Sequence, residues 1–380
     1  MRVFRRRRRA KGADESPRRR SGPLSGDPDN SGNPGIPGAT AAPLNGDRAR
    51  LGWLAGGALA LLLAGATIGH WLWQSGRSSE PLPTLPPAAG QAAPLVQAPA
   101  GPPTAAAPAR AKAPVPWTTL AELLQRPASE RLRWSRFEPN PAILVLEYPN
   151  LREQGLAMNR LAAMFEKRAG HRDRVLTEAE LSELMRRSGD TVASFYQGHD
   201  YPAAKVARFF TLAESQRMLL NPQETQLLAL LVDSGFMKRS AGGAYQAMGE
   251  QAAVSFTGVQ PDDPATAPDE AIDRLRREAV LRHELSHGEF FTNADYRAHS
   301  LKFWRNELRE QERRVFSAYL AGLDYNPGDE ELMANETQAL LMHTPDSRAF
   351  SAGSLGVSDA ALADLRNRFR RGEPVHGLKR

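Results

Sequence analysis

Residues 278–293 of the 380-residue chain, EAVLRHELSHGEFFTN, contain the pattern H-E-x-x-H from His283 to His287. Residues four apart lie on one face of a helix, so the two imidazoles can hold a single metal ion. Glu284 is rotated away from that face but still borders the open side of the ion, where it can accept a proton from water. The stretch therefore predicts a helix with a catalytic metal site, and it decides the fold around it.

The predicted motif helix begins at about Asp269, its N-cap, and ends at His287. Its apolar residues recur at roughly helical spacing, at Ile272, Leu275, Ala279 and Leu285. Gly288 follows where a C-cap glycine belongs. The sequence thus places the metal site at the C-terminal end of a capped helix, where the helix dipole favours a cation.

A catalytic zinc needs a third protein ligand and one open position. Residues 329–343, DEELMANETQALLMH, predict a second helix with acidic residues in its first turn. Glu336 stands among apolar residues of this helix, and a buried carboxylate needs a partner or a metal. Glu336 is therefore the predicted third ligand, and Glu331 and Glu289 are the next candidates.

The H-E-x-x-H pattern and the later helix with Asn335-Glu336 together resemble the gluzincin zinc metallopeptidases. In that family the third ligand is a Glu on a downstream helix, often preceded by Asn. The resemblance implies that His283, His287 and Glu336 bind Zn²⁺. It also implies that Glu284 is the general base.

Two further segments, 289–293 and 332–339, are similar to uncharacterised bacterial proteins with the same residues around both motifs. The gap of 49 positions between His287 and Glu336 is longer than that of thermolysin-like enzymes, which leaves the gluzincin subfamily open. The metzincin pattern is absent, because Asn293 stands where that pattern has a third His.

Attack on an amide carbonyl builds an oxyanion, which needs a hydrogen-bond donor. His343 follows Glu336 by seven residues, on about the same face of the helix, and is the predicted catalytic donor; the alternative is an exposed His at a helix end. Tyr296 and Tyr325 are either alternative donors or packing residues. The His-Asp-Tyr segment 199–201 is either a second polar site or an ordinary turn.

Two short apolar runs, Ala142–Tyr148 and Ala252–Val259, predict buried strands. The resemblance implies that a sheet edge near the motif helix binds the substrate as an added strand. The run Ala252–Val259 is the expected edge, because a short loop joins it to the motif helix. Glu289 and Asn293 are expected either to orient the ligand imidazoles or to serve the loop and helix cap.

Composition divides the chain into four parts: a disordered basic tail 1–50, a transmembrane helix 51–73, a linker 74–116 rich in Pro and Ala, and a catalytic domain 117–380. Residues 1–50 hold 12 Lys/Arg and 5 Asp/Glu, whereas the other 330 residues hold 37 and 38. The basic character therefore belongs to the tail, and the domain is not expected to bind nucleic acid.

Residues 51–73, LGWLAGGALALLLAGATIGHWLW, have no formal charge and are long enough to cross a bilayer. Arg48 and Arg50 before this run predict a cytoplasmic N-terminus and a domain in the periplasm or outside the cell. A cleaved signal peptide is the alternative, although the run ends in His-Trp-Leu-Trp without a small-residue cleavage site.

The predicted fold is therefore α+β, a mostly helical zincin-like metallopeptidase domain with a small sheet, behind a single N-terminal transmembrane helix. The predicted function is that of a zinc metallopeptidase anchored in the inner membrane by residues 51–73, with a peptide or protein as substrate. The chain has no Cys, which excludes a Cys nucleophile. Two alternatives stay open: a non-hydrolytic envelope protein that binds a partner or metal, and an amidase that acts on cell-wall peptides.

Overall fold

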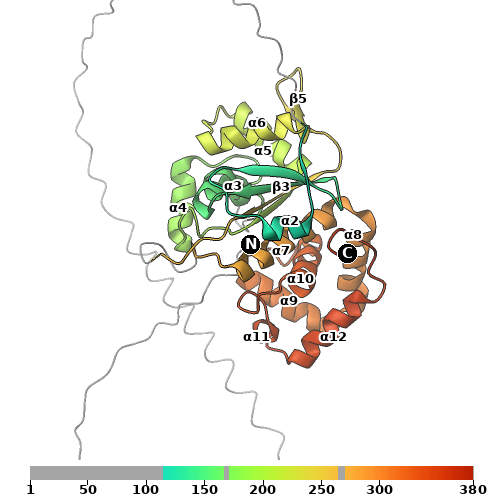
Figure 1. Cartoon of the computed structure of the whole chain (residues 1–380). Coiled ribbons are helices and arrows are strands. Elements are labelled where there is room, and N and C mark those ends of the chain that lie inside the picture. The colour runs from blue at the N-terminus through green and yellow to red at the C-terminus, as the bar shows by residue number, and fades with distance from the viewer. Residues whose placement is uncertain (1–113, 167–170, 264–269, 380) are drawn as a thin grey trace, which may run out of the picture. The chain divides into compact units, whose positions relative to one another are not determined.

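A five-stranded mixed sheet lies between two layers of helices in the computed structural model, which describes residues 114–166, 171–263 and 270–379 (Figure 1). The sheet order is β1-β2-β3-β7-β4. The pairs β1–β2 and β3–β7 are parallel, whereas β2–β3 and β7–β4 are antiparallel. Its strands are β1 (Trp117–Thr118), β2 (Arg133–Phe137), β3 (Ile143–Tyr148), β4 (His199–Pro202) and β7 (Ala252–Thr257).

One layer covers the upper face of the sheet in Figure 1, together with a small β-hairpin. Its elements are α3 (Leu151–Phe165), α4 (Glu178–Ser188), α5 (Ala203–Ser215), α6 (Pro222–Asp233), β5 (Met237–Arg239) and β6 (Tyr245–Ala247).

The other layer covers the lower face and contains both helices on which the sequence predicts metal ligands. Its elements are α2 (Leu120–Gln125), α7 (Arg274–Thr292), α8 (Ala294–Lys302), the π-helix η2 (Phe303–Glu307), α9 (Glu310–Gly322), α10 (Glu330–His343), α11 (Ala352–Leu355) and α12 (Asp359–Arg370).

The two faces of β3 supply two hydrophobic cores, because successive side chains of a strand point to opposite sides. Ile143 and Val145 belong to the core that contains α7 and α10. Leu144 and Leu146 belong to the core beneath α3, α5 and α6. Since helices cover both faces, β3 is apolar almost throughout. This is why the strand is a continuous apolar run in the sequence and not an alternation of polar and apolar residues.

Two contacts hold α7 against the sheet. Arg277, near its start, forms a buried ion pair with Glu147 of β3, with 3.0 Å between Nη2 and Oε1. Gly288 packs on Ile143 of the same strand, and a Cβ atom at Gly288 would lie only 2.9 Å from the Ile143 Cδ1 atom. The position therefore needs a residue without a side chain.

The role of Gly288 differs from the prediction. The helix continues through this residue to Thr292 and is capped by Asn293, with Asp273 as its N-cap. The metal motif consequently lies within α7, one turn or more from its end. Close packing on the sheet, and not a turn at the helix end, accounts for the glycine.

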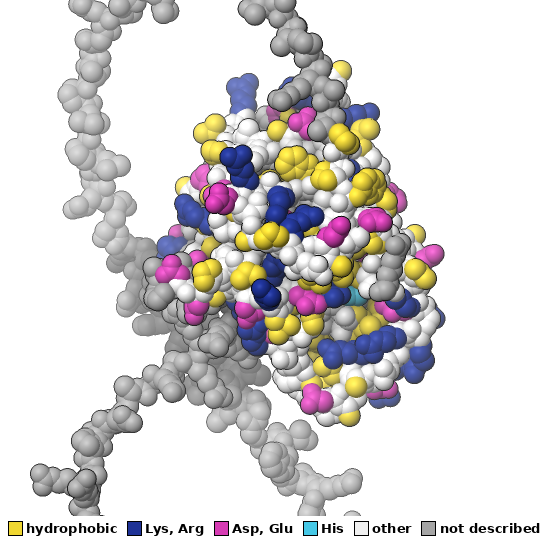
Figure 2. Space-filling view, viewed as in Figure 1, with side chains coloured by type: hydrophobic (Ala, Val, Ile, Leu, Met, Phe, Trp, Pro, Cys, Tyr) yellow, Lys and Arg dark blue, Asp and Glu magenta, His cyan; other side chains and the backbone are white. Residues whose placement is uncertain are grey.

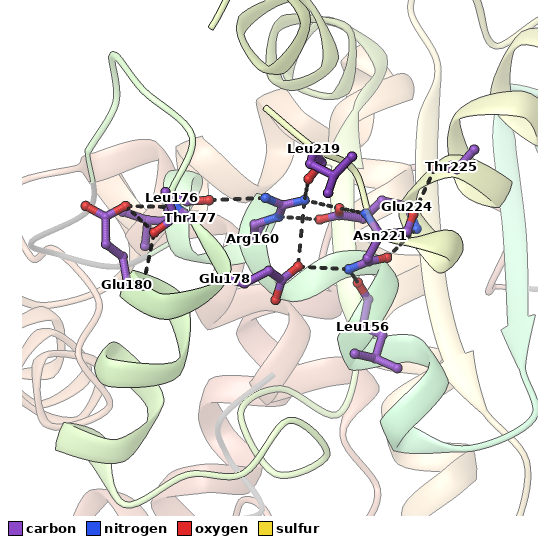
Figure 3. Close-up of polar contacts among 10 residues, drawn as sticks. All are labelled: Leu156, Arg160, Leu176, Thr177, Glu178, Glu180, Leu219, Asn221, Glu224 and Thr225. Carbon is purple, nitrogen blue, oxygen red and sulfur yellow. Dashed lines mark hydrogen bonds and ion pairs between the residues drawn. The ribbon is translucent and has the colours of Figure 1, made fainter. Parts of the chain in front are cut away.

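The layer above the sheet is held by Arg160 of α3, which is almost fully buried (Figure 3). Its guanidinium forms a two-pronged ion pair with Glu224 of α6, and its remaining N–H groups donate to the carbonyls of Leu176 and Leu219. A buried charge is tolerated when it is paired and its other hydrogen bonds are made. This cluster therefore serves the fold, on the side of the sheet opposite the metal motif.

The predicted fold class was wrong because it included a transmembrane helix. The described residues form an α+β structure with a small sheet, about 52% helical, and none of their helices is long and apolar enough to cross a membrane. The longest of them, α7, has 19 residues but carries charged side chains along its length. The predicted tail 1–50, the predicted span 51–73 and residues 74–113 of the predicted linker lie outside the described residues.

Two predicted elements also change. The apolar spacing of residues 119–132 predicts one helix, interrupted or restarted at Pro127, but α2 ends at Gln125 and the strand β2 follows it. The run Ala252–Val259 does form a strand, but β7 lies between β3 and β4 and is not an edge. The edge next to it is β4, which contains the His-Asp-Tyr segment 199–201 that the sequence predicts as either a second polar site or an ordinary turn.

Candidate metal centre

The three predicted metal ligands converge in one place, between α7 and α10. The Nε2 atoms of His283 and His287 lie 3.6 and 3.7 Å from the two carboxylate oxygens of Glu336. One ligand atom from each residue lies within 4.8 Å of the other two. All three side chains are buried, and little imidazole surface shows on the face of the molecule in Figure 2, over which Lys, Arg, Asp and Glu are spread.

Thr344, just beyond the end of α10, orients His283. The His283 Nδ1 atom lies 2.9 Å from the Thr344 hydroxyl, and that hydroxyl donates its proton to the carbonyl of Ala339. The hydroxyl therefore accepts a hydrogen bond from His283 Nδ1–H. This assigns the tautomer in which Nε2 keeps its lone pair, facing Glu336, as metal binding requires.

One nitrogen of His287, Nε2, faces two carboxylates. Its Nε2 atom lies 3.7 Å from Glu336 and 3.8 Å from Asp200 of β4, both beyond hydrogen-bond distance. Its Nδ1 atom is buried and has no hydrogen-bond partner among the described residues. The ring is thus held by packing, with Nε2 pointing into a space lined by oxygen atoms.

Glu284 is buried beside the ligands, and neither of its carboxylate oxygens has a hydrogen-bond partner in the described part of the chain. Burial raises its pKa well above the usual range, and the negative charges of Asp200 and Glu336 act in the same direction. Gly198, directly before β4, packs so closely on Glu284 that a Cβ atom there would collide with the carboxylate. The strand that forms the sheet edge therefore also confines the predicted base.

Three carboxyl groups, those of Asp200, Glu284 and Glu336, thus meet two imidazoles in a buried space. Within the described ranges, no Lys or Arg forms an ion pair with any of the three. Burial raises the pKa of Glu336, against the opposing effect of His287. Such a group of unpaired acids is costly unless protons or a cation neutralise it, and the donor set of two imidazoles and a carboxylate is one that Zn²⁺ accepts.

His343, the predicted oxyanion donor, lies in a different cluster. Its Nε2 atom is 2.9 Å from the hydroxyl of Tyr296, which itself donates to Gln338 Oε1 at 2.6 Å. Because the Tyr296 hydroxyl donates its proton to Gln338, His343 Nε2–H is the donor to the Tyr296 oxygen. Gln338 in turn donates to Ser286 of the motif helix. His343 and Tyr296 are therefore engaged in a chain of buried hydrogen bonds that joins α8, α10 and α7.

A second group of metal-binding residue types, His343, Glu373 and His376, belongs to this cluster. His376 Nδ1 accepts a hydrogen bond from the backbone of Leu378 at 3.3 Å, so its Nε2–H donates to Glu373 at 3.1 Å. Lys379 also pairs with Glu373, at 3.4 Å. Both nitrogens of His376 are engaged and the carboxylate is neutralised, so this group needs no ion.

Tyr325, the other predicted donor, lies beside the ligands. It is buried, and its interaction with Glu336 opposes the larger effect of burial, which raises the pKa of that carboxyl. Burial, followed by the charge of Glu336, raises the pKa of Tyr325 well above its usual range, so the phenol keeps its proton. Among the three predicted donors, this is the one that the structure brings to a ligand.

The remaining candidates face away from the ligands. Glu289 is buried and accepts hydrogen bonds from Gly377 N–H at 2.9 Å and from the Asn140 side-chain amide at 3.1 Å. Asn293 caps α8 by accepting from Tyr296 N–H at 3.1 Å. Glu331 is half exposed and pairs with Arg297. The first two therefore serve the fold around the helix ends, and the third is a surface ion pair.

Sequence reasoning missed Thr344 and assigned no role to Asp200 alone. For Asp200 the only signal was its place in the His-Asp-Tyr segment 199–201; the alternation of burial along β4, with Asp200 out of phase with His199 and Tyr201, is a property of the structure. For Thr344 there was no such signal, because its partner His283 is 61 residues away.

In comparisons with known proteins, no family model, no curated protein and no solved structure matched the chain.

Proposed function

We propose that this chain is a zinc-dependent peptidase of the gluzincin type, in which His283, His287 and Glu336 hold the ion. The observation that carries the proposal is the convergence of these three buried side chains around a fourth, Glu284, whose carboxylate has no hydrogen-bond partner among the described residues. A buried carboxylate without a partner is costly in a purely structural role, whereas a general base needs free oxygens.

Zinc bound by these residues would act as a Lewis acid that polarises the substrate carbonyl and makes water more acidic. The residues supply the rest of the reaction. Glu284 accepts a proton as the water oxygen bonds to the carbonyl carbon, and it returns this proton to the nitrogen as the C–N bond breaks. Tyr325, which keeps its proton and lies beside Glu336, is the donor best placed to stabilise the negative charge on the former carbonyl oxygen.

The sheet edge supports a peptide as the substrate. Among the described strands, β4 pairs on one side only, with β7, and its residue Asp200 faces the ligands. An extended peptide added to the free side of β4 would make main-chain hydrogen bonds and pass close to Glu284. This mode of binding accepts many side chains, so the proposal specifies an extended peptide and no sequence.

The test uses the full chain loaded with one equivalent of Zn²⁺ and a library of unstructured peptides analysed by mass spectrometry. Cleavage by the wild type is expected, and Glu284→Gln should keep its zinc while losing cleavage by at least about 10²-fold. Glu278→Gln is the matched control, because Glu278 lies on the same helix but pairs with Arg282.

A zinc-loaded wild type that cleaves no peptide would overturn the peptidase and favour a non-hydrolytic metal-binding protein. Cleavage of cell-wall peptides alone would instead assign the amidase reaction to the same residues.

A further inference from the structure

Asp200 is placed on the metal side of the sheet by strand register. In the antiparallel β4–β7 pair it lies opposite Val254, which belongs to the core beneath α7. Residues directly opposite in a sheet share a face, so the Asp200 side chain points toward α7. Its neighbours point the other way: His199 bonds to Ser255 and Tyr201 to Glu166.

The Asp200 carboxylate reaches the same nitrogen that binds the ion in the proposed function. Its Oδ2 atom lies 3.8 Å from His287 Nε2, nearly the same as the 3.7 Å between that nitrogen and Glu336. Ligand atoms of Asp200, Glu284 and His287 all lie within 4.8 Å of one another. Its side chain keeps 18% of its surface exposed, more than the 1% of His287 and the 6% of Glu336.

No Lys or Arg among the described residues pairs with the Asp200 carboxylate, and His287 is the basic side chain that lies beside it. Burial raises the pKa of Asp200 and the negative charge of Glu336 acts in the same direction, whereas His287 and the Glu284 side chain oppose this rise. A carboxylate that served only the surface would turn outward, away from two other acids. A divalent cation at His287 Nε2 would reduce the repulsion between Asp200 and Glu336, and four protein ligands are the usual number for zinc in a closed site.

We propose that Asp200 is a fourth protein ligand, which occupies the open position of the ion while no substrate is bound. The proposal rests on the metal site of the proposed function and adds a mode of regulation to it. Asp200 belongs to the strand whose free side would pair with the peptide, so a small movement of β4 on peptide binding would withdraw the carboxylate and open the site to water. The protein would then be inactive at rest without a separate inhibitory segment.

The test compares metal binding in the full-length wild type and two variants, Asp200→Asn and Asp200→Ala. Zinc affinity is measured by competition with a chromophoric chelator, and coordination by the visible absorption of the Co²⁺-loaded protein. We expect both variants to bind zinc at least about tenfold more weakly and to change the Co²⁺ bands. Asp359→Asn is the matched control, because Asp359 is an exposed acid in the first turn of α12.

Unchanged zinc affinity together with unchanged Co²⁺ bands in Asp200→Asn would overturn the proposal. Asp200→Asn keeps the shape of the side chain and all main-chain bonds of β4, and it is therefore expected to fold. Circular dichroism before metal is added checks this. The two hypotheses fail separately. A wild type that binds no zinc defeats the proposed function, whereas a wild type that binds zinc no better than Asp200→Asn defeats only the role of Asp200.

Discussion

The His283 Nδ1 atom and the Thr344 hydroxyl lie 2.9 Å apart although 61 residues separate them in the chain. The hydroxyl passes its own proton to the carbonyl of Ala339 at 3.0 Å, so it can only accept from the imidazole. One threonine at the end of α10 thereby fixes the tautomer of a ligand on α7. It also couples the two helices that supply the metal ligands.

Thr344→Val is expected to lower zinc affinity by about 10- to 100-fold, because the valine cannot accept the Nδ1 proton and the ring loses its fixed orientation. Chelator competition measures the change. Thr337→Val is the matched control: Thr337 is equally buried on α10, but its hydroxyl has no hydrogen-bond partner among the described residues. Equal affinities of the two variants would show that Thr344 does not orient His283.

Glu336→Gln is expected to reduce bound zinc below one equivalent after dialysis, since an amide is a weaker ligand than a carboxylate. Metal analysis by mass spectrometry gives the stoichiometry. Glu331→Gln, on the same helix but at the surface and paired with Arg297, should retain the full equivalent. Full retention by Glu336→Gln would move the third ligand to another residue.

Gly288→Ala is expected to lower the free energy of unfolding by about 1–3 kcal/mol, because the added methyl group would be forced against Ile143. Urea denaturation measures the loss. Gly322→Ala, at the last residue of α9, is the control: no atom of the described residues lies within 4 Å of the position its Cβ would take, so a neutral or slightly stabilising effect is expected. A neutral Gly288→Ala would mean that α7 can move away from β3.

Stability is expected to depend on pH through Asp273, the N-cap of α7. The Arg348 guanidinium beside it holds the pKa of Asp273 at about 2 in the folded chain. An unfolded Asp titrates at about 3.9, so the folded state binds fewer protons between these values. The stabilisation is therefore complete above about pH 4 and is lost as the pH falls toward 2.

The measurement is the urea midpoint of the wild type and of Arg348→Gln from pH 7 to pH 2. The variant should be less stable at pH 7, and the difference should shrink below pH 4. Lys238→Gln, an exposed residue of β5 with no ion pair to any described residue, should show no such trend. A constant difference down to pH 2 would exclude Asp273 as the partner that matters.

The helix patterns were the most predictable part of the chain, since helical period and capping depend on neighbouring residues. The prediction that Gly288 ends the motif helix failed because the role of this glycine depends on a residue far away in the chain. A glycine after an apolar helix reads as a cap, and only the packing of Ile143 shows that it permits a close approach. Likewise, β7 read as an edge strand because nothing local reveals that the segment 199–202 pairs beside it.

The sequence by itself determined that His283, His287 and Glu284 share one helix and that Glu336 stands on another, because a four-residue spacing sets the face of a helix without any distant contact. Only the tertiary structure decided that Glu336 meets the two imidazoles, that Asp200 joins them through strand register and that Thr344 fixes a tautomer. Those relationships depend on how helices and strands far apart in the chain pack together, and packing of that kind leaves no periodic signal in the sequence.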